Sequence, residues 1–284
     1  MSFGFVDCHQ HFWQLSRGDY AWLTSDLTTL YRDFLPEDLR PLIASNNVHK
    51  TIVVQAAPTD AETDFLLELA AATNFIAGVV GWVDMTAANA PERIKSLAQN
   101  PWFKGIRPML QDIEDVNWML RPELAPAFET LQKLDLSFDA LVMPRHLENL
   151  LVLLQRYPGL RCVINHGAKP DISSDAWQPW AQQMSAIARE TGAHCKLSGL
   201  LTEAGDDASA ESLQPYMAHL LDVFGAARLM WGSDWPVLNL AGDYQTWINM
   251  AQEFLRDAAP AHEAEIMAGN ATNFYRIKRE GSES

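Results

Sequence analysis

The chain has few cysteines, few basic residues and no long apolar run. Its three cysteines among 284 residues, Cys8, Cys162 and Cys195, lie in segments that resemble buried strands. An odd number of cysteines in such places favours reduced thiols, so we expect a cytoplasmic protein. No apolar run approaches the ~20 residues that span a bilayer, and the N-terminus lacks the basic and apolar regions of a leader. We therefore expect no membrane partner.

Positive charge is also scarce. The chain has 21 lysines and arginines against 36 acidic residues, which gives a formal net charge of −15. Nucleic acids and anionic membrane surfaces are bound by basic patches, so the charge balance disfavours both as partners. Hydrophobic residues, in contrast, make up 48% of the chain, which is ample for a packed core and argues against disorder.

Short runs rich in β-branched residues alternate with segments of helical periodicity. This alternation is typical of βα units around a parallel sheet. Eight runs are predicted to be strands: Phe5–His11, Thr51–Ala57, Ile76–Val83, Gly105–Leu110, Leu136–Val142, Cys162–His166, His194–Leu200 and Leu229–Ser233. Because no linker interrupts the pattern, we expect one α/β domain over residues 1–284, a (β/α)8 TIM barrel.

Two segments fall outside this pattern. Residues 14–35 are rich in aromatic and polar side chains and follow the first strand, so we expect a loop over the mouth of the barrel. The last residues, 279–284, are expected to form a frayed tail.

Two histidines stand at the end of the first predicted strand, in the stretch FVDCHQHFW. Residues i and i+2 of a strand share a face, so His9 and His11 aim at one point. Two later strands also end in a group that can bind a metal or move a proton, His166 in INHG and Asp234 in GSDWP. Functional groups of such barrels collect at the carboxyl ends of the strands. We therefore predict one enzyme site built from these four residues.

Five motifs taken together resemble those of the amidohydrolase superfamily, and more narrowly its amidohydrolase-2 branch of TIM-barrel hydrolases and sugar-acid lactonases. In chain order they are FVDCHQHFW, KGIRPML, INHGAKP, KLSGLLTEA and LMWGSDWP. The resemblance implies that His9, His11 and Asp234 are metal ligands, with His166 as a further candidate ligand. It also implies that Asp234 and His166 are catalytic.

The chain departs from the dinuclear members of that superfamily. Where they carry a bridging lysine or glutamate at the end of strand four, this chain has Arg107 and Met109, and its fifth strand has no histidine before its end. A two-metal site is therefore not expected. The ligand types suit one Zn²⁺ or Mn²⁺. Because the branch includes lactonases that work without a metal, a required ion and a non-essential one both remain open.

Four further residues are candidates for substrate binding, three of them with a structural alternative. Arg107 is suited to clamping a carboxylate or polarising a carbonyl, or else to pairing with Asp112 or Asp84. Trp13 would stack on a sugar ring or pack in the core. His146 would reach the mouth or sit in the first turn of a helix, and Gln55 would hydrogen-bond the substrate.

Residues around the seventh strand are weaker candidates: Lys196, Ser198 and Glu203. Lys196 shares the strand phase of Ser198. Its structural alternative is to fill a polar layer inside the barrel.

The residues and the resemblance lead to one functional expectation. We expect a hydrolase that opens a sugar-acid lactone, such as L-fuconolactone or L-rhamnonolactone, with Asp234 as the general base that activates water. The histidines and Arg107 would stabilise the oxyanion. The partner is then a small-molecule lactone, and the sequence leaves open whether the chain forms homo-oligomers.

Three alternatives remain. The first is a zinc-dependent decarboxylase of an aromatic or vinylogous acid on the same barrel. The second is hydrolysis of an amide or cyclic imide, which the missing strand-four lysine disfavours. The third is a catalytically silent barrel that only binds.

Overall fold

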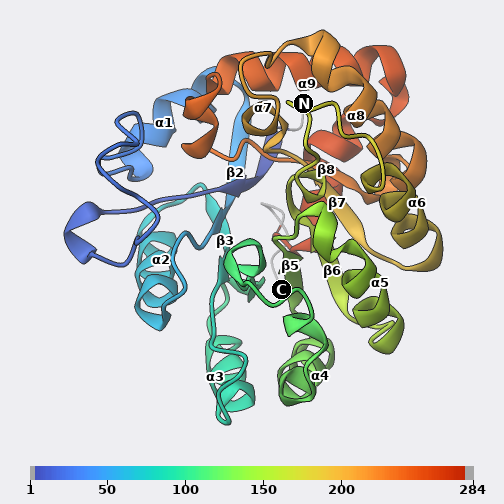
Figure 1. The fold of residues 1–284 in the computed structure, drawn as a ribbon. Coiled ribbons are helices and arrows are strands. Elements are labelled where there is room, and N and C mark those ends of the chain that lie inside the picture. The colour runs from blue at the N-terminus through green and yellow to red at the C-terminus, as the bar shows by residue number, and fades with distance from the viewer. Residues whose placement is uncertain (1–3, 279–284) are drawn as a thin grey trace.

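The computed structural model describes residues 4–278 and shows a barrel of eight parallel strands ringed by helices (Figure 1). The strands pair in sequence order, which confirms the predicted (β/α)8 fold. They are β1 (Phe5–Gln10), β2 (Val48–Val54), β3 (Ile76–Gly81), β4 (Phe103–Ile106), β5 (Ser137–Ala140), β6 (Arg161–Ile164), β7 (His194–Leu197) and β8 (Leu229–Trp231). The predicted tail, 279–284, lies outside the described residues.

All eight predicted strands are present, but each ends earlier than predicted. The apolar run continues past the hydrogen-bonded ladder, into the turns that lead to the mouth of the barrel. After β6, for example, residues Asn165–Ala168 leave the sheet as a tight turn. Short loops therefore follow the carboxyl ends of the strands, and these loops carry most of the candidate site.

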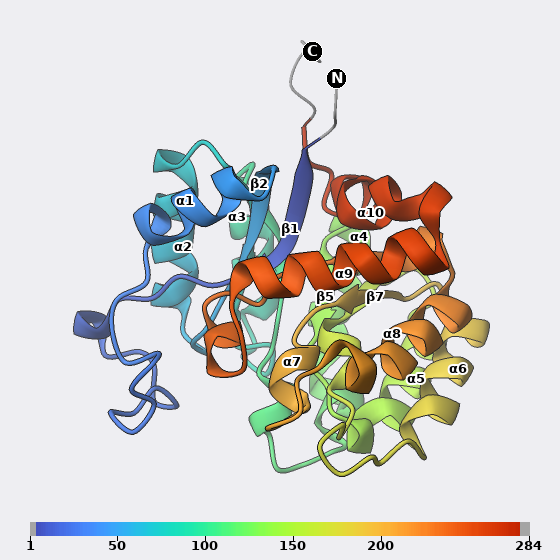
Figure 2. The same cartoon turned by 90° about the horizontal axis from the view of Figure 1, so that it is seen from above.

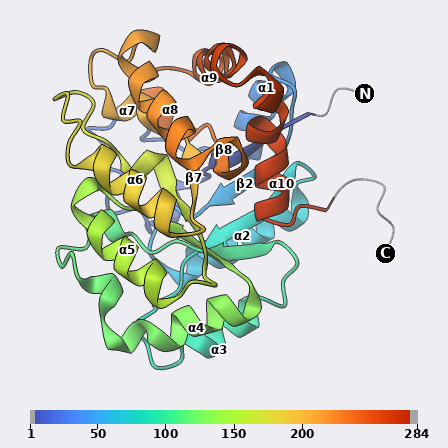
Figure 3. The same cartoon turned by 90° about the vertical axis from the view of Figure 1, so that its right-hand side faces the viewer.

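Helices cover the outside of the sheet and bury their apolar faces against it. They are α1 (Pro36–Ser45), α2 (Asp60–Ala72), α3 (Ala90–Leu97), α4 (Ala125–Leu134), α5 (Leu147–Arg156), α6 (Trp180–Glu190), α7 (Leu200–Glu203), α8 (Ala210–Phe224), α9 (Tyr244–Ala258) and α10 (Asn270–Phe274). Figure 3 shows α5, α6 and α8 lying side by side along one flank. Within residues 4–278, no helix is long and apolar enough to cross a membrane.

The barrel closes between β1 and the segment that follows β8. The amide of Asp234 donates to the carbonyl oxygen of His9 at 2.8 Å, and the amide of His11 donates to that of Trp235 at 2.7 Å. One oxygen of the buried Asp7 carboxylate accepts the amides of Ser233 and His9, at 2.8 and 3.1 Å. The closure thus fixes the backbone on both sides of two candidate site residues.

The amino end of the barrel is sealed by the C-terminal helix. Figure 2 shows α10 beside the start of β1. Phe274 and Tyr275 pack with Val6 and Met230 in one apolar cluster. The hydroxyl of Tyr275 donates at 2.7 Å to Asp139 in the barrel interior. The interior at this end of the barrel is therefore a filled core.

The segment 14–35 extends from β1 and returns to it, as the dark blue stretch of Figure 1 shows. An antiparallel bridge between Trp13 and Phe34 joins its two ends. Tyr20, within it, donates its hydroxyl proton at 2.6 Å to Glu62, a buried residue of the first turn of α2. Glu62 also accepts the amide of Ala56 at 3.1 Å. One buried carboxyl group thus anchors the segment to the barrel.

This anchor predicts a pH-dependent stability. Burial raises the pKa of Glu62 to about 7, so the folded state holds its proton more tightly than the unfolded chain does. The stability that this proton gives is complete below pH 4.5 and is lost as the pH rises through 7. We expect the free energy of unfolding, measured by urea titration, to fall between pH 5 and 8 by about 2–3 kcal/mol more in the wild type than in Glu62→Gln.

A matched control lies on the same helix. Glu68 is exposed, so Glu68→Gln should follow the wild type at every pH. A wild type and a Glu62→Gln variant with parallel profiles would refute the role given to Glu62.

Candidate active site

A cavity of about 170 Å³ opens at the carboxyl ends of the strands. Four residues expected from the sequence line it: His11, Arg107, His166 and Asp234. Residues from other strand ends and loops complete the lining: Trp22, Ala56, Met109, Gln111, Asp112, Leu141, Lys169 and Val237. The tertiary structure thus gathers groups that lie up to 223 positions apart in the chain.

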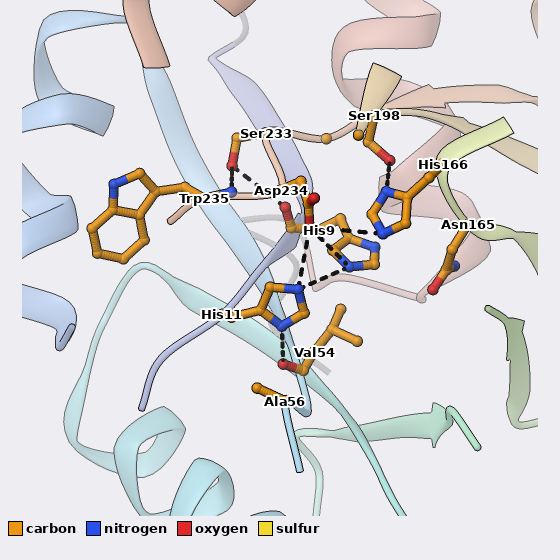
Figure 4. A network of polar contacts seen from close by, with 12 residues as sticks. His9, His11, Val54, Ala56, Asn165, His166, Ser198, Ser233, Asp234 and Trp235 are labelled. Atoms are coloured by element: carbon orange, nitrogen blue, oxygen red, sulfur yellow. Dashed lines mark hydrogen bonds and ion pairs between the residues drawn. The ribbon is translucent and has the colours of Figure 1, made fainter. Parts of the chain in front are cut away.

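Three side chains converge on one point beneath this cavity (Figure 4). The Nε2 atom of His11 lies 3.2 Å from Nε2 of His9 and 3.2 Å from Oδ1 of Asp234. Nε2 of His9 lies 3.7 Å from the same oxygen, as does Nε2 of His166. All four residues are buried. The nitrogen and oxygen atoms of His9, His11 and Asp234 lie close enough to one another to coordinate a single metal ion.

The environment of His11 determines which of its nitrogens carries a proton. Its Nδ1 lies 2.7 Å from the carbonyl oxygen of Val54, which can only accept, so Nδ1 donates. In the neutral ring Nε2 then offers a lone pair, and it faces a carboxylate oxygen of Asp234. Two acceptors at this distance require a proton or a cation between them. Imidazole and carboxylate ligands suit Zn²⁺, so the group fits one divalent ion.

A buried ion pair holds His9 from the other side. The Lys196 ammonium lies 3.1 Å from Nδ1 of His9 and 2.6 Å from Oδ2 of Asp139. Neither Lys196 nor Asp139 is exposed. Asp139 also accepts the hydroxyl protons of Tyr275, at 2.7 Å, and of Ser137, at 2.8 Å. Lys196 therefore lies in a polar layer of the barrel, and that layer touches the candidate site.

Two of the site residues adopt unusual backbone conformations. His166 has φ +53° and Asp234 has φ +60°, in the left-handed region that non-glycine residues rarely occupy. Such strain is concentrated at functional sites, where the surrounding structure enforces it. The ring of His166 packs directly on Gly199, because a Cβ there would lie 2.5 Å from its Nδ1. The Oγ atom of Ser198 lies 2.9 Å from the same Nδ1.

Burial keeps the imidazoles neutral. It is the main cause that lowers the pKa of His166 to about 3 and holds the pKa of His9 well below its ordinary value. It also lowers the pKa of His11. Burial alone would raise the pKa of Asp234, but the interactions with His166 and His11 outweigh it and bring that pKa to about 2. Near neutral pH the site is an ionised carboxylate among neutral imidazoles.

Arg107 brings a buried positive charge to the cavity. Burial lowers its pKa to about 10, so the guanidinium stays charged at neutral pH. It donates to the carbonyl oxygen of Gln55, its Nη1 lies 3.4 Å from Nε2 of His9, and its Nε has no hydrogen-bond partner. Among residues 4–278 no carboxylate lies at ion-pair distance from Arg107, so the predicted alternative of a pair with Asp112 or Asp84 is not formed. A buried cation without a counterion is costly and is available to a negatively charged group.

Trp13 packs in the core, which was one of its two predicted alternatives, and another tryptophan lines the cavity. Trp13 is fully buried against Phe34 and donates its indole proton at 2.8 Å to the carbonyl oxygen of Arg32. Trp22, which we did not single out, lines the cavity and is held by a 2.7 Å hydrogen bond to the carbonyl oxygen of Ala56. Its place in the aromatic segment after the first strand was the available signal.

The other two candidates, Gln55 and His146, do not line the cavity. Gln55 is fully buried and donates at 2.6 Å to the carbonyl oxygen of Arg107, so it supports the backbone of that residue. His146 is in the turn before α5, where its Nδ1 accepts the amide of Met143 at 3.1 Å. This is the first-turn position that the sequence left open as its alternative.

The chain matches the amidohydrolase family model over residues 6–277. It is 49% identical over 278 residues to a curated L-fucono-1,5-lactonase of Burkholderia ambifaria and 34% identical over 284 residues to one of Burkholderia multivorans, with 96% of each chain covered. Its fold matches the crystal structure of a zinc-bound amidohydrolase of Burkholderia multivorans with a TM-score of 0.92. That match has 32% sequence identity and covers 96% of this chain and 99% of the other.

Gly199 offers a test of how tightly the site is packed. Gly199→Ala places a methyl group against the His166 ring at a residue with φ +66°. Gly18 has φ +72° and nothing within 4 Å of the same methyl position, so Gly18→Ala isolates the cost of the backbone conformation, about 1 kcal/mol. We expect Gly199→Ala to lose a further 1–3 kcal/mol or so from overpacking, measured by urea unfolding. Equal losses in the two variants would contradict the contact.

Proposed function

Because the chain belongs to the amidohydrolase family, we propose that it is a lactonase that opens a sugar-acid 1,5-lactone, with L-fucono-1,5-lactone as the first candidate substrate. The observation that carries this proposal is the similarity, over nearly the full length of both chains, to a curated lactonase of that name. The product is the free aldonic acid.

The cavity supports a compact polar ring as the substrate. Its volume of about 170 Å³ suits one monosaccharide-sized molecule. Trp22 offers an aromatic face on one side, and Arg107, Asp112 and Lys169 offer charged groups for hydroxyls and the carbonyl. The lining thus combines one apolar surface with several hydrogen-bonding groups, as sugar recognition needs.

Asp234 is the proposed general base. Its carboxylate takes a proton from a water molecule, and the oxygen of that water attacks the lactone carbonyl carbon. The tetrahedral intermediate then collapses, the bond between the carbonyl carbon and the ring oxygen breaks, and Asp234 returns its proton to the ring oxygen. A carboxylate with so low a pKa is a weak base, but a lactone is an activated ester and needs only modest assistance.

The negative charge that develops on the carbonyl oxygen needs a positive or hydrogen-bonding partner. Arg107 is suited to this because its charge is buried and has no carboxylate partner among the described residues. His166 lines the same cavity. A divalent ion held by His9, His11 and Asp234 would, when bound, polarise the carbonyl as a Lewis acid.

The test is hydrolysis of a panel of aldonolactones, measured through the protons that the acid products release. We expect turnover above the spontaneous rate with L-fucono-1,5-lactone, and a kcat lower by about 10²–10⁴-fold in Asp234→Asn, because the base is removed while the shape is kept. Chelator-treated and zinc-loaded enzyme are measured side by side to determine whether the ion is required. No turnover on any lactone, together with CO₂ release from an aromatic acid, would replace this proposal with the decarboxylase alternative.

Trp22 provides a test of the binding mode. Trp22→Ala removes the aromatic wall of the cavity, so KM should rise about tenfold with a smaller change in kcat, since stacking on a ring contributes about 1 kcal/mol or more. Trp102 lies at the start of β4, at the other end of the barrel, and Trp102→Ala should leave KM as in the wild type. An unchanged KM in Trp22→Ala would place the substrate elsewhere.

A further inference from the structure

Lys196 is a fully buried lysine that contacts the candidate site without lining its cavity. Its ammonium has two close polar partners, the carboxylate of Asp139 at 2.6 Å and Nδ1 of His9 at 3.1 Å. An ammonium group has protons to donate and no lone pair to accept with. Since Lys196 forms an ion pair with Asp139, Nδ1 of His9 must be the acceptor of its second hydrogen bond.

We propose that Lys196 fixes the tautomer of His9, so that the proton of this imidazole stays on Nε2 and points into the catalytic group. A neutral imidazole carries one proton, and accepting a hydrogen bond at Nδ1 places that proton on the other nitrogen. His9 then acts as a hydrogen-bond donor toward His11 and Asp234. Lys196 is a positioning residue, because it acts through His9 and does not line the cavity.

The surrounding contacts agree with this assignment. His11 donates through Nδ1 to Val54 and so presents a lone pair at Nε2. That lone pair is 3.2 Å from Nε2 of His9, so one nitrogen donates and the other accepts. Asp234 Oδ1, 3.7 Å away, is a second acceptor for the same proton. The chain of donors from Lys196 through His9 to His11 is therefore complete.

The assignment also explains how His11 and Asp234 can lie so close together. Two acceptors at 3.2 Å repel each other, and the His9 proton lies at the side of both. The 3.4 Å approach of Arg107 Nη1 to His9 Nε2 is then a contact between two N–H groups and not a hydrogen bond. The proton of His9 therefore lies among the three residues that would coordinate a metal ion, His9, His11 and Asp234.

A consequence follows for metal binding. Nε2 of His9 can ligate a metal only after its proton has left that nitrogen. A shift of the proton to Nδ1 would break the hydrogen bond from Lys196, and the buried positive charge of Lys196 repels a dication. Lys196 should therefore weaken the metal affinity of the group formed by His9, His11 and Asp234. This inference deepens the proposed function, on which it rests only for its catalytic consequence. The experiments below use no substrate, so a failure of the lactonase proposal would not be confused with a failure of this one.

The first experiment examines the wild-type protein alone. In ¹⁵N-histidine-labelled, metal-free protein, long-range ¹H–¹⁵N correlation spectra distinguish a protonated ring nitrogen from an unprotonated one. The His9 signals are identified by their loss in His9→Gln. We expect Nε2 of His9 to be protonated and Nδ1 unprotonated, and the reverse pattern in His11. A proton on Nδ1 of His9 overturns the proposal, and no variant of Lys196 needs to fold for this result.

The second experiment removes the ion pair as a unit. Lys196→Met with Asp139→Asn takes away the donor to His9 without leaving a bare buried carboxylate. We expect the dissociation constant for Zn²⁺, measured by competition with a chromogenic chelator, to fall at least tenfold, and the preference of His9 for the Nε2 proton to disappear. Lys196→Arg keeps a cationic donor and should retain the wild-type tautomer.

A matched control separates this effect from a general change of charge. Lys169 pairs with Glu203 at 2.7 Å beside the same cavity, and among the described residues its ammonium makes no hydrogen bond to an imidazole. Lys169→Met with Glu203→Gln therefore removes an equivalent ion pair without altering a histidine contact, and its Zn²⁺ affinity should change much less. Unchanged affinity in the Lys196 pair variant, or equal tightening in the control, overturns the proposal.

Discussion

The closure of the barrel between β1 and the end of β8 is the interaction on which the site depends. The hydrogen bonds from Asp234 to His9 and from His11 to Trp235 join the first and last strands. The same bonds bring a carboxylate from one end of the chain between two imidazoles from the other. Asp7 reinforces this junction by accepting backbone amides from both segments. The hydrogen bonds that close the barrel are therefore the same ones that bring the site residues together.

The chemistry of the site follows from burying many polar groups in a small volume. Neutral imidazoles surround an ionised carboxylate, and Arg107 adds a positive charge without a carboxylate partner among the described residues. These groups are expensive to desolvate, and the left-handed backbone at His166 and Asp234 adds strain. Packing elsewhere offsets this cost, since two apolar clusters fill most of the rest of the protein. A site held so firmly is preorganised for charge that appears during a reaction.

The residues that gather at the mouth could be expected because they end strands. His9, His11, His166 and Asp234 each follow an apolar run, and a parallel barrel brings such ends together whatever their distance in sequence. The strand pattern could not predict where side chains beyond the strand ends would point. Trp13 and Trp22 are both aromatic and both follow β1, but a chain reversal between Trp13 and Phe34 buries the first, and the second lines the cavity.

By itself the sequence determined the number of strands, the closed parallel barrel and the chemical groups at its mouth, because hydrophobic periodicity and strand order are local properties of the chain. Only the tertiary structure decided which atoms of those groups meet. The Val54 carbonyl that orients His11 and the ion pair between Lys196 and Asp139 that contacts His9 come from other strands. Hydrogen-bond direction depends on such neighbours, and no pattern along one strand records them.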